Sequence, residues 1–373
     1  MNHDFRLRKN KPKQTQFIAA KPACRGEVIY EAGPPRSQTK RKQLTATGGW
    51  LYWGFLKRQN VNLRENTKEC IMAKTKKYHG VVVPMVTPFT EKGEIDIPAA
   101  KRVTEHIVAG GASAFVLGTT GEAASVPQQG RAEFVKAAVE QTAGRTLTYA
   151  GIASNCFKTS VDAAKKYFDL GVDAVVANLP SYYPLNADQM LKYFEALADS
   201  VPGPLIVYNI TITTHMSIPL DVVEKLSHHP NVVALKDSEK NEERFKEAIA
   251  MWKDREDFSH FTGSAVLSAM ALLLGSDGIV PSTGNFVPEI YRDLYEAAVA
   301  GDADKAHHLQ EKTNELGKIY QKDRLLSQSL AALKVIMNEL GLCGEAVLPP
   351  LVRAGAEEKA DILAKLTAAG ISK

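Results

Sequence analysis

Two apolar runs, LIVYNI at residues 205–210 and VVALK at residues 232–236, are joined by a stretch that includes a helix-like segment at residues 220–226. Neither run alternates apolar with polar residues, so we expect other parts of the protein to cover both faces of each strand. Strands of this kind, separated by an amphipathic helix, are typical of a parallel sheet built from βα units. The pair therefore predicts an α/β fold.

The same strand-and-helix unit repeats through most of the chain. Successive runs begin 26 to 33 residues apart, except for the last gap, which is shorter. Helix-like segments lie between them, for example at residues 99–108 and 129–141. Eight units over about 220 residues predict a closed (β/α)8 TIM barrel, and no Gly-x-Gly-x-x-Gly follows the first strand to indicate a dinucleotide-binding sheet. The runs begin near Val81, Ala114, Leu147, Ala174, Leu205, Val232, Phe258 and Gly278.

Three more helix-like segments follow the eighth unit, at residues 303–320, 325–340 and 357–366. We expect the barrel to occupy residues 74–300 and these segments to form a C-terminal helical appendage at residues 301–373. Such an appendage often serves in packing or oligomerisation.

Residues 1–73 differ from the rest in charge and in pattern. They carry 15 Lys/Arg and 5 Asp/Glu, whereas residues 74–373 carry 31 and 37, so the net charge of +4 comes from the first fifth of the chain. This segment lacks sustained periodicity, and we expect a basic, disordered extension. Three interpretations stay open: a mistaken upstream start with Met72 as the natural one, a targeting segment, or a basic arm that binds polyanions.

The composition is that of an ordinary globular protein, with 45% hydrophobic and 24% charged residues. No apolar run approaches the roughly 20 residues that a membrane-spanning helix needs, so no membrane is expected as a partner. The acidic balance of residues 74–373 argues against nucleic acid as a partner of the main domain. A reducing, cytoplasmic location is indicated by four cysteines without metal-ligand or disulfide spacing, namely Cys24, Cys70, Cys156 and Cys343.

The active site of a TIM barrel lies at the C-terminal ends of the strands, and Lys236 directly follows such a strand. A lysine removed from water loses proton affinity, so its free amine can act as a nucleophile at neutral pH. That amine can condense with a ketone to an imine, which withdraws electrons while a carbon–carbon bond breaks or forms. The alternative is a lysine that reaches solvent and pairs with Asp237.

Other polar residues also stand at strand ends. Tyr208 ends the neighbouring strand and could relay protons, or it could simply pack. Thr119 and Thr120 lie between two glycines after the second strand and could bind a carboxylate, or they could form an ordinary turn. We expect Glu122, which follows them, to brace the loop through hydrogen bonds.

Together these residues resemble the dihydrodipicolinate synthase/N-acetylneuraminate lyase family of class I aldolases. The resemblance extends from about residue 80 to residue 351 and rests on the order and spacing of several short motifs. These are residues 80–89, Gly118-Thr119-Thr120-Gly121-Glu122, Tyr182-Tyr183, Tyr208-Asn209, Leu235-Lys236-Asp237, Gly275-Ser276-Asp277-Gly278, Leu333-Lys334 and Pro349-Pro350-Leu351.

The resemblance implies a role for each matching residue. Lys236 forms the imine with a 2-oxo acid, typically pyruvate, and Tyr208 relays protons. Thr119 and Thr120 hold the substrate carboxylate and complete the relay, which Tyr183 joins across a tight dimer interface. A homo-oligomer, a tetramer built as a dimer of dimers, is implied as well. No metal or organic cofactor is implied, because the imine supplies the electron sink. Further substrate contacts are implied at Gly263 and Ser282.

Two departures from the family concern the second substrate. The arginine that grips a carboxylate in the synthases falls on Thr213, so a bidentate clamp is absent. The acidic residues that bind the polyol tail in sialic-acid lyases are missing after Gly263. We therefore expect a smaller, less charged distal pocket, lined by Thr213, Thr214, His215, Ser264 and Ala265. His215 could act as an acid or base there, or it could be an exposed loop residue.

These observations predict a lyase that reversibly cleaves a 2-keto-3-deoxy sugar acid or a 4-hydroxy-2-oxo acid to pyruvate and an aldehyde. Alternatives on the same imine are the synthesis of 4-hydroxy-tetrahydrodipicolinate in lysine biosynthesis and a dehydration. Outside catalysis, the barrel could bind a 2-oxo acid or a partner protein, or the basic N-terminal arm could be the functional part.

Overall fold

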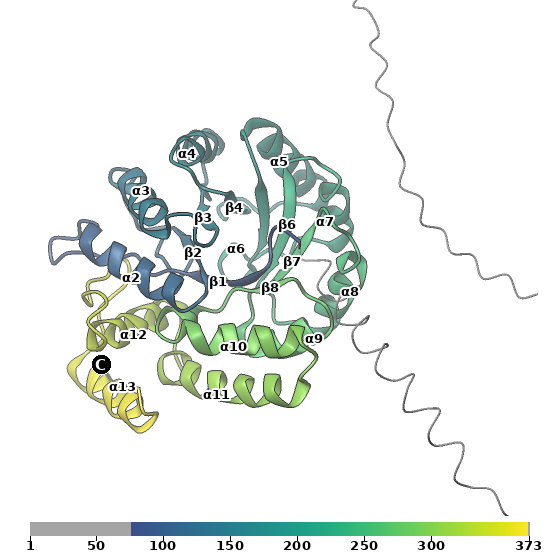
Figure 1. The fold of residues 1–373 in the computed structure, drawn as a ribbon. Helices are drawn as coiled ribbons and strands as arrows, with labels where there is room; N and C mark the ends of the chain where they lie inside the picture. Colours follow the sequence, from purple (N-terminus) through teal and green to yellow (C-terminus); the bar gives the residue numbers. More distant parts are fainter. Residues whose placement is uncertain (1–75, 372–373) are drawn as a thin grey trace, which may run out of the picture. The chain divides into compact units, whose positions relative to one another are not determined.

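The computed structural model describes residues 76–371, so the prediction for residues 1–73 lies outside the described part. Eight parallel strands close into a barrel in sequence order (Figure 1). Each strand begins within one residue of a predicted run, and the predicted TIM-barrel fold is confirmed. The strands are β1 (Gly80–Pro84), β2 (Ser113–Val116), β3 (Thr148–Gly151), β4 (Ala174–Asn178), β5 (Leu205–Asn209), β6 (Val232–Asp237), β7 (Ser259–Thr262) and β8 (Gly278–Ile279).

Helices follow the strands and cover the outside of the barrel (Figure 1). Local sequence sets where several of them begin: Asp96 accepts a hydrogen bond from the Ala99 amide, and Asn186 and Gln189 form a capping box. The helices are α2 (Ile97–Ala109), α3 (Arg131–Thr142), α4 (Phe157–Asp169), α5 (Ala187–Ser200), α6 (Thr211–Thr214), α7 (Leu220–Leu226), α8 (Glu242–Trp252), α9 (Ser268–Leu273) and α10 (Pro288–Val299), with short 3-10 turns at Ala265–Leu267 and Ser282–Asn285.

The predicted C-terminal appendage consists of three helices, α11 (Ala303–Gln321), α12 (Leu326–Glu339) and α13 (Ala356–Ala368). Helix α11 runs alongside α10, and α12 and α13 pack against each other beyond it (Figure 1). No helix within residues 76–371 is both long and apolar enough to cross a bilayer.

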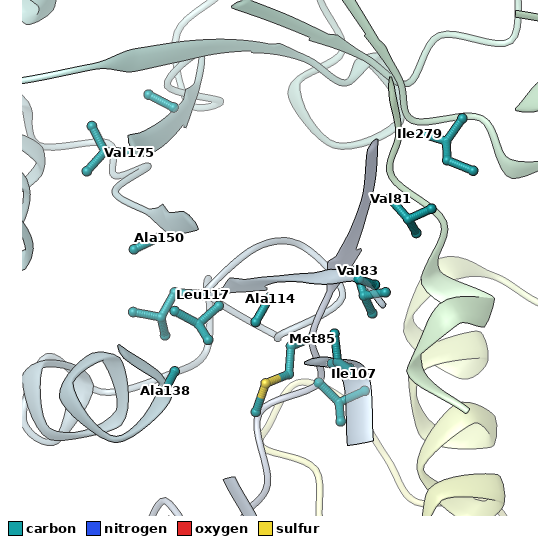
Figure 2. Close-up of a cluster of buried hydrophobic side chains, with 14 of the residues drawn as sticks. Val81, Val83, Met85, Ile107, Ala114, Leu117, Ala138, Ala150, Val175 and Ile279 are labelled. Atoms are coloured by element: carbon teal, nitrogen blue, oxygen red, sulfur yellow. The ribbon is translucent and has the colours of Figure 1, made fainter. Parts of the chain in front are cut away.

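Alternation along the strands divides the hydrophobic core into two parts. One set of side chains points outward and packs against the helices. Figure 2 shows part of this layer, with Val83 of β1, Met85 just after β1, and Ile107 of α2. The other set, which includes Val82, Phe115 and Phe261, fills the barrel interior. Because the strands are apolar on both faces, each strand contributes side chains to both parts of the core.

Candidate active site

Lys236 stands near the C-terminal end of β6, on the face that points into the barrel. In the strand register it lies between Tyr208 of β5 and Phe261 of β7. The residue is 5% exposed, and its Nζ lies 3.9 Å from the centre of the Tyr208 ring and 4.9 Å from that of Phe115. The amine is therefore surrounded by aromatic carbon.

A small cavity of about 10 Å³ lies beside the Lys236 side chain inside the barrel. Because this volume is about that of one water molecule, the amine has little solvent on this side. Burial lowers the pKa of Lys236, and its interaction with Tyr208 opposes this shift to a smaller extent. The neutral, nucleophilic amine is thus favoured. The other residues lining the cavity are Val82, Phe115, Tyr149, Val176, Ile206, Phe261 and Val280.

Asp237 does not neutralise Lys236. Strand alternation turns neighbouring side chains to opposite faces, and the Asp237 carboxylate accepts a hydrogen bond from Arg244 Nε at 2.6 Å and one from Asn209 Nδ2 at 2.9 Å. Burial raises the pKa of Asp237, and Arg244 opposes that shift. The sequence alternative, in which Lys236 reaches solvent and pairs with Asp237, is therefore not what the structure shows.

Tyr208 is also buried, and its hydroxyl has a neighbour that the sequence analysis missed. Ser238 Oγ lies 3.5 Å from Tyr208 Oη. A side chain on Gly263 would place its Cβ 2.0 Å from Ser238 Oγ, so only glycine permits this approach of β6 to β7. The alternation of side chains along a strand could have predicted this neighbour, because residues two apart, such as Lys236 and Ser238, lie on the same face.

Thr119 and Thr120 belong to a tight turn after β2, residues 117–122, here named the threonine turn. Two residues of this turn that are not glycine adopt left-handed backbone angles, Leu117 at φ 56° and Glu122 at φ 54°. Within residues 76–371 neither threonine hydroxyl donates a hydrogen bond to protein, whereas the Gly121 carbonyl accepts one from Thr87 Oγ1 at 2.6 Å. The turn is held by its backbone, and its hydroxyls are available to a ligand.

The threonine turn is connected to the lysine through Phe115. A side chain on Gly118 would place its Cβ 2.8 Å from the Phe115 ring, the same ring that lies near Lys236 Nζ. The turn and the amine therefore share one aromatic wall at the C-terminal end of the barrel.

Glu122 braces the threonine turn through hydrogen bonding, as expected from the sequence, and its side chain also forms an ion pair that was not predicted. Its carboxylate forms an ion pair with Lys334 of α12 at 2.5 Å and accepts a hydrogen bond from the Leu348 amide at 3.2 Å. Glu122 and Lys334 are 4% and 0% exposed. A buried pair thus joins the C-terminal appendage to the turn.

The residues expected at the distal pocket, and the expected substrate contact Ser282, differ in their exposure and in their hydrogen-bond partners. Thr213 Oγ1 lies 3.5 Å from the Ile210 carbonyl, and His215 is exposed beyond α6. Ser264 is buried, and its hydroxyl has no hydrogen-bond partner among the described residues. Ser282 Oγ is 2.7 Å from Tyr320 Oη and accepts a hydrogen bond from Gln321 Nε2 at 3.2 Å. The Ser282 hydroxyl is therefore bound by the end of α11.

Tyr183 lies apart from Lys236 and Tyr208 in the single chain. It is 69% exposed, and its ring packs at 5.0 Å, edge to face, against Tyr182. No hydrogen bond joins it to either residue in the described part of the chain, so its role in the relay stays a prediction that needs a second subunit.

Residues 76–371 contain no group of three or more His, Cys, Asp or Glu side chains placed to hold a metal ion. Within these residues, the Lys236 amine lies against the Tyr208 and Phe115 rings, and Ser238 Oγ lies 3.5 Å from Tyr208 Oη.

Comparison with known proteins identifies the family of the chain. The Dihydrodipicolinate synthetase family matches residues 77–369. The chain is 31% identical, over 78% of its length and 98% of the relative's, to a 4-hydroxy-tetrahydrodipicolinate synthase of Leptothrix cholodnii. Among solved structures it resembles a dihydrodipicolinate synthase of Bacteroides thetaiotaomicron at 32% identity with a TM-score of 0.74, covering 78% and 98% of the two chains.

A second similar structure was solved with pyruvate bound. The dihydrodipicolinate synthase of Acinetobacter baumannii, solved in complex with pyruvate, is 25% identical with a TM-score of 0.72, and the match covers 79% of this chain and 99% of that one. The family match spans the whole barrel and the appendage. The chain therefore belongs to the dihydrodipicolinate synthetase family of carbon–carbon lyases.

Proposed function

We propose that Lys236 forms an imine with pyruvate, and that the chain uses this imine to make or break a carbon–carbon bond with an aldehyde. The observation that carries the proposal is the amine itself, which is buried against two aromatic rings, without a carboxylate partner in the described part of the chain, and has a lowered pKa. Such an amine is a nucleophile near neutral pH.

The neighbouring residues suit the proton transfers of this reaction. Lys236 Nζ attacks the ketone carbon, the carbinolamine loses water, and the imine forms. Loss of a proton from the adjacent methyl group then gives an enamine, which adds to the aldehyde carbon; hydrolysis of the new imine returns the amine. Tyr208, whose ring contacts the amine, is placed to carry protons between the nitrogen and the departing oxygen. Thr119 and Thr120 would hold the pyruvate carboxylate with their uncommitted hydroxyls.

The test is reduction with borohydride in the presence of pyruvate, followed by peptide mass spectrometry. A pyruvyl adduct on the peptide that contains Lys236 is the expected result. A folded protein that gives no adduct with pyruvate, or an adduct on another lysine, would overturn the proposal.

Two aldehyde partners are supported by different observations. The names of the relatives favour the synthesis of 4-hydroxy-tetrahydrodipicolinate. Thr213 favours the cleavage of a 2-keto-3-deoxy sugar acid or a 4-hydroxy-2-oxo acid, because it replaces the arginine of a bidentate carboxylate clamp. Dehydration through the same imine is a third reaction that Lys236 could support.

One set of assays separates these reactions. A synthase would form 4-hydroxy-tetrahydrodipicolinate from pyruvate and an aldehyde that carries an amino-acid group. A lyase would release pyruvate from a 2-oxo sugar acid. A dehydratase would release water from the same kind of acid without forming pyruvate. A Thr213→Arg variant sharpens the result: it should lower the KM for an aldehyde with a carboxylate and leave pyruvate binding unchanged.

We further propose that the enzyme acts in the cytoplasm as a homotetramer made of two tight dimers. The exposed Tyr182 and Tyr183 pair supports this, since two adjacent aromatic rings at the surface are typical of interface residues. Light scattering that gives only the monomer mass at all concentrations would contradict the assembly and the role of Tyr183 across it.

A further inference from the structure

We infer that Lys334, on helix α12 of the C-terminal appendage, is a positioning residue for the reaction. Through Glu122 it holds the threonine turn in the conformation that binds the 2-oxo acid carboxylate. The inference rests on the proposed function, because it assigns a reason for the shape of that binding site. It makes the C-terminal appendage part of the active-site structure.

The threonine turn has a strained backbone. Leu117 and Glu122 both have positive φ, at 56° and 54°, and side chains other than glycine rarely adopt this region. Residues held there cost free energy, and they persist only where the surroundings fix them. The two strained residues enclose Thr119 and Thr120, so the strain is located where the proposed ligand binds.

Different neighbours contact the start, the middle and the end of the threonine turn. At the start, a Cβ on Gly151 would lie 2.0 Å from the Leu117 carbonyl oxygen, which shows how closely β3 approaches. In the middle, Thr87 Oγ1 donates to the Gly121 carbonyl at 2.6 Å. At the end, the Glu122 carboxylate is the only side chain of the turn with an ion pair in residues 76–371, and that pair is with Lys334.

The buried Lys334 amine has several partners. Its Nζ pairs with Glu122 at 2.5 Å, donates to the Ala346 carbonyl at 2.6 Å and lies 4.1 Å from the centre of the Phe89 ring. Phe89 follows β1, and Ala346 and Leu348 follow α12. A buried pair with this many partners fixes position more firmly than an exposed pair, which solvent screens.

The test compares variants that break the Glu122–Lys334 pair with one that breaks a more exposed ion pair of the C-terminal appendage. Glu122→Leu/Lys334→Met removes both charges and keeps a volume-filling apolar contact, so the core need not hold an unpaired charge. Glu122→Gln keeps the volume of the side chain but has one acceptor oxygen in place of two, so it can accept from Lys334 or from Leu348 and not from both. The control is Arg324→Met, which breaks the 2.6 Å pair of Arg324 with Glu358 between the loop after α11 and helix α13.

The readout is borohydride trapping on Lys236 over a range of pyruvate concentrations and pH. We expect the double variant to need at least ten times more pyruvate for half-maximal adduct, and Glu122→Gln at least three times more. The pH dependence of the adduct should stay unchanged, because the burial of Lys236 is unaffected. Arg324→Met should match the unmodified protein in both respects, even where its melting temperature falls.

The outcomes separate the inference from the proposed function. No adduct in the unmodified protein would overturn both. An adduct there, with the same half-saturating pyruvate in a folded double variant, would overturn only the positioning role. If the double variant does not fold, Glu122→Gln decides: an unchanged half-saturating concentration counts against the inference, and a threefold rise supports it. A shift as large in Arg324→Met would reduce the effect to general stability and would also overturn it.

Discussion

Lys236 and Lys334 are both buried lysines, yet their surroundings differ in one respect. Lys334 has a carboxylate at 2.5 Å and a carbonyl oxygen at 2.6 Å. Lys236 has two aromatic rings and, within the described residues, no ion pair. Protonating an amine without a counter-charge in an apolar site is costly. Burial lowers the pKa of both amines, and only at Lys334 does a carboxylate oppose this shift. We infer that pairing makes Lys334 structural and that its absence makes Lys236 reactive.

The largest expected effect comes from Lys236→Met. Turnover and the pyruvate adduct should both be lost, because no other group replaces the nucleophile. Stability should not fall by more than about 1.5 kcal/mol, since methionine has a similar volume and needs no hydration. Adduct trapping and thermal unfolding of the same preparation check both expectations. A large loss of stability would show that the Lys236 amine has a structural role after all.

The second effect concerns Tyr208→Phe, which removes only a hydroxyl. Turnover should fall by roughly 10²- to 10⁴-fold, as expected for loss of a proton-transfer group. Imine formation should fall much less, because the ring still packs against the amine. Steady-state turnover is measured beside single-turnover trapping. Equal losses in both would make Tyr208 a packing residue.

The third effect is a loss of stability, in contrast to the loss of turnover expected for Lys236→Met. Lys334→Met leaves the buried Glu122 carboxylate without its counter-charge and with only the Leu348 amide as a donor, which should lower the free energy of unfolding by about 3–5 kcal/mol. The loss should exceed that of Arg324→Met, whose ion pair is partly exposed to solvent. Denaturant unfolding of the two variants at the same pH checks this. Equal losses would mean that the buried Glu122–Lys334 pair contributes no more to stability than a partly exposed pair.

The positions of Lys236 and Tyr208 at strand ends could be predicted from local pattern, whereas their roles in the reaction rest on the family resemblance and stay predictions. Apolar runs mark the strands, and a barrel places its site at their ends. Lys334 was noted only as part of the Leu333-Lys334 motif, and its pairing with Glu122 could not be predicted, because only tertiary packing brings these distant residues together. The same holds for Ser282, whose hydroxyl is bound by Tyr320 and Gln321 of α11. Local periodicity predicts elements, whereas contacts between distant elements depend on the folded geometry.

A smaller effect is expected in the pH dependence of imine formation. The lowered pKa of Lys236 means that the adduct rate should reach half its maximum below about 10.4, the ordinary value for lysine. The rate should fall as pH drops through this pKa, because protonation removes the lone pair. Since Tyr208 raises the pKa of Lys236, Tyr208→Phe should move the midpoint to lower pH. A midpoint at or above the ordinary value would contradict the contrast between the two lysines.

The smallest effect is expected from Ser238→Ala. At 3.5 Å, the hydrogen bond from Ser238 Oγ to Tyr208 Oη is at the long limit for such contacts. A neutral hydrogen bond contributes about 0.5–1.5 kcal/mol at normal length, so a long one should change turnover by less than about tenfold. Turnover of this variant is compared with that of Tyr208→Phe. A loss as large as that of Tyr208→Phe would mean that the serine shortens its contact when substrate binds and shares in the proton transfer, which would extend the reactive group around Lys236 by one residue.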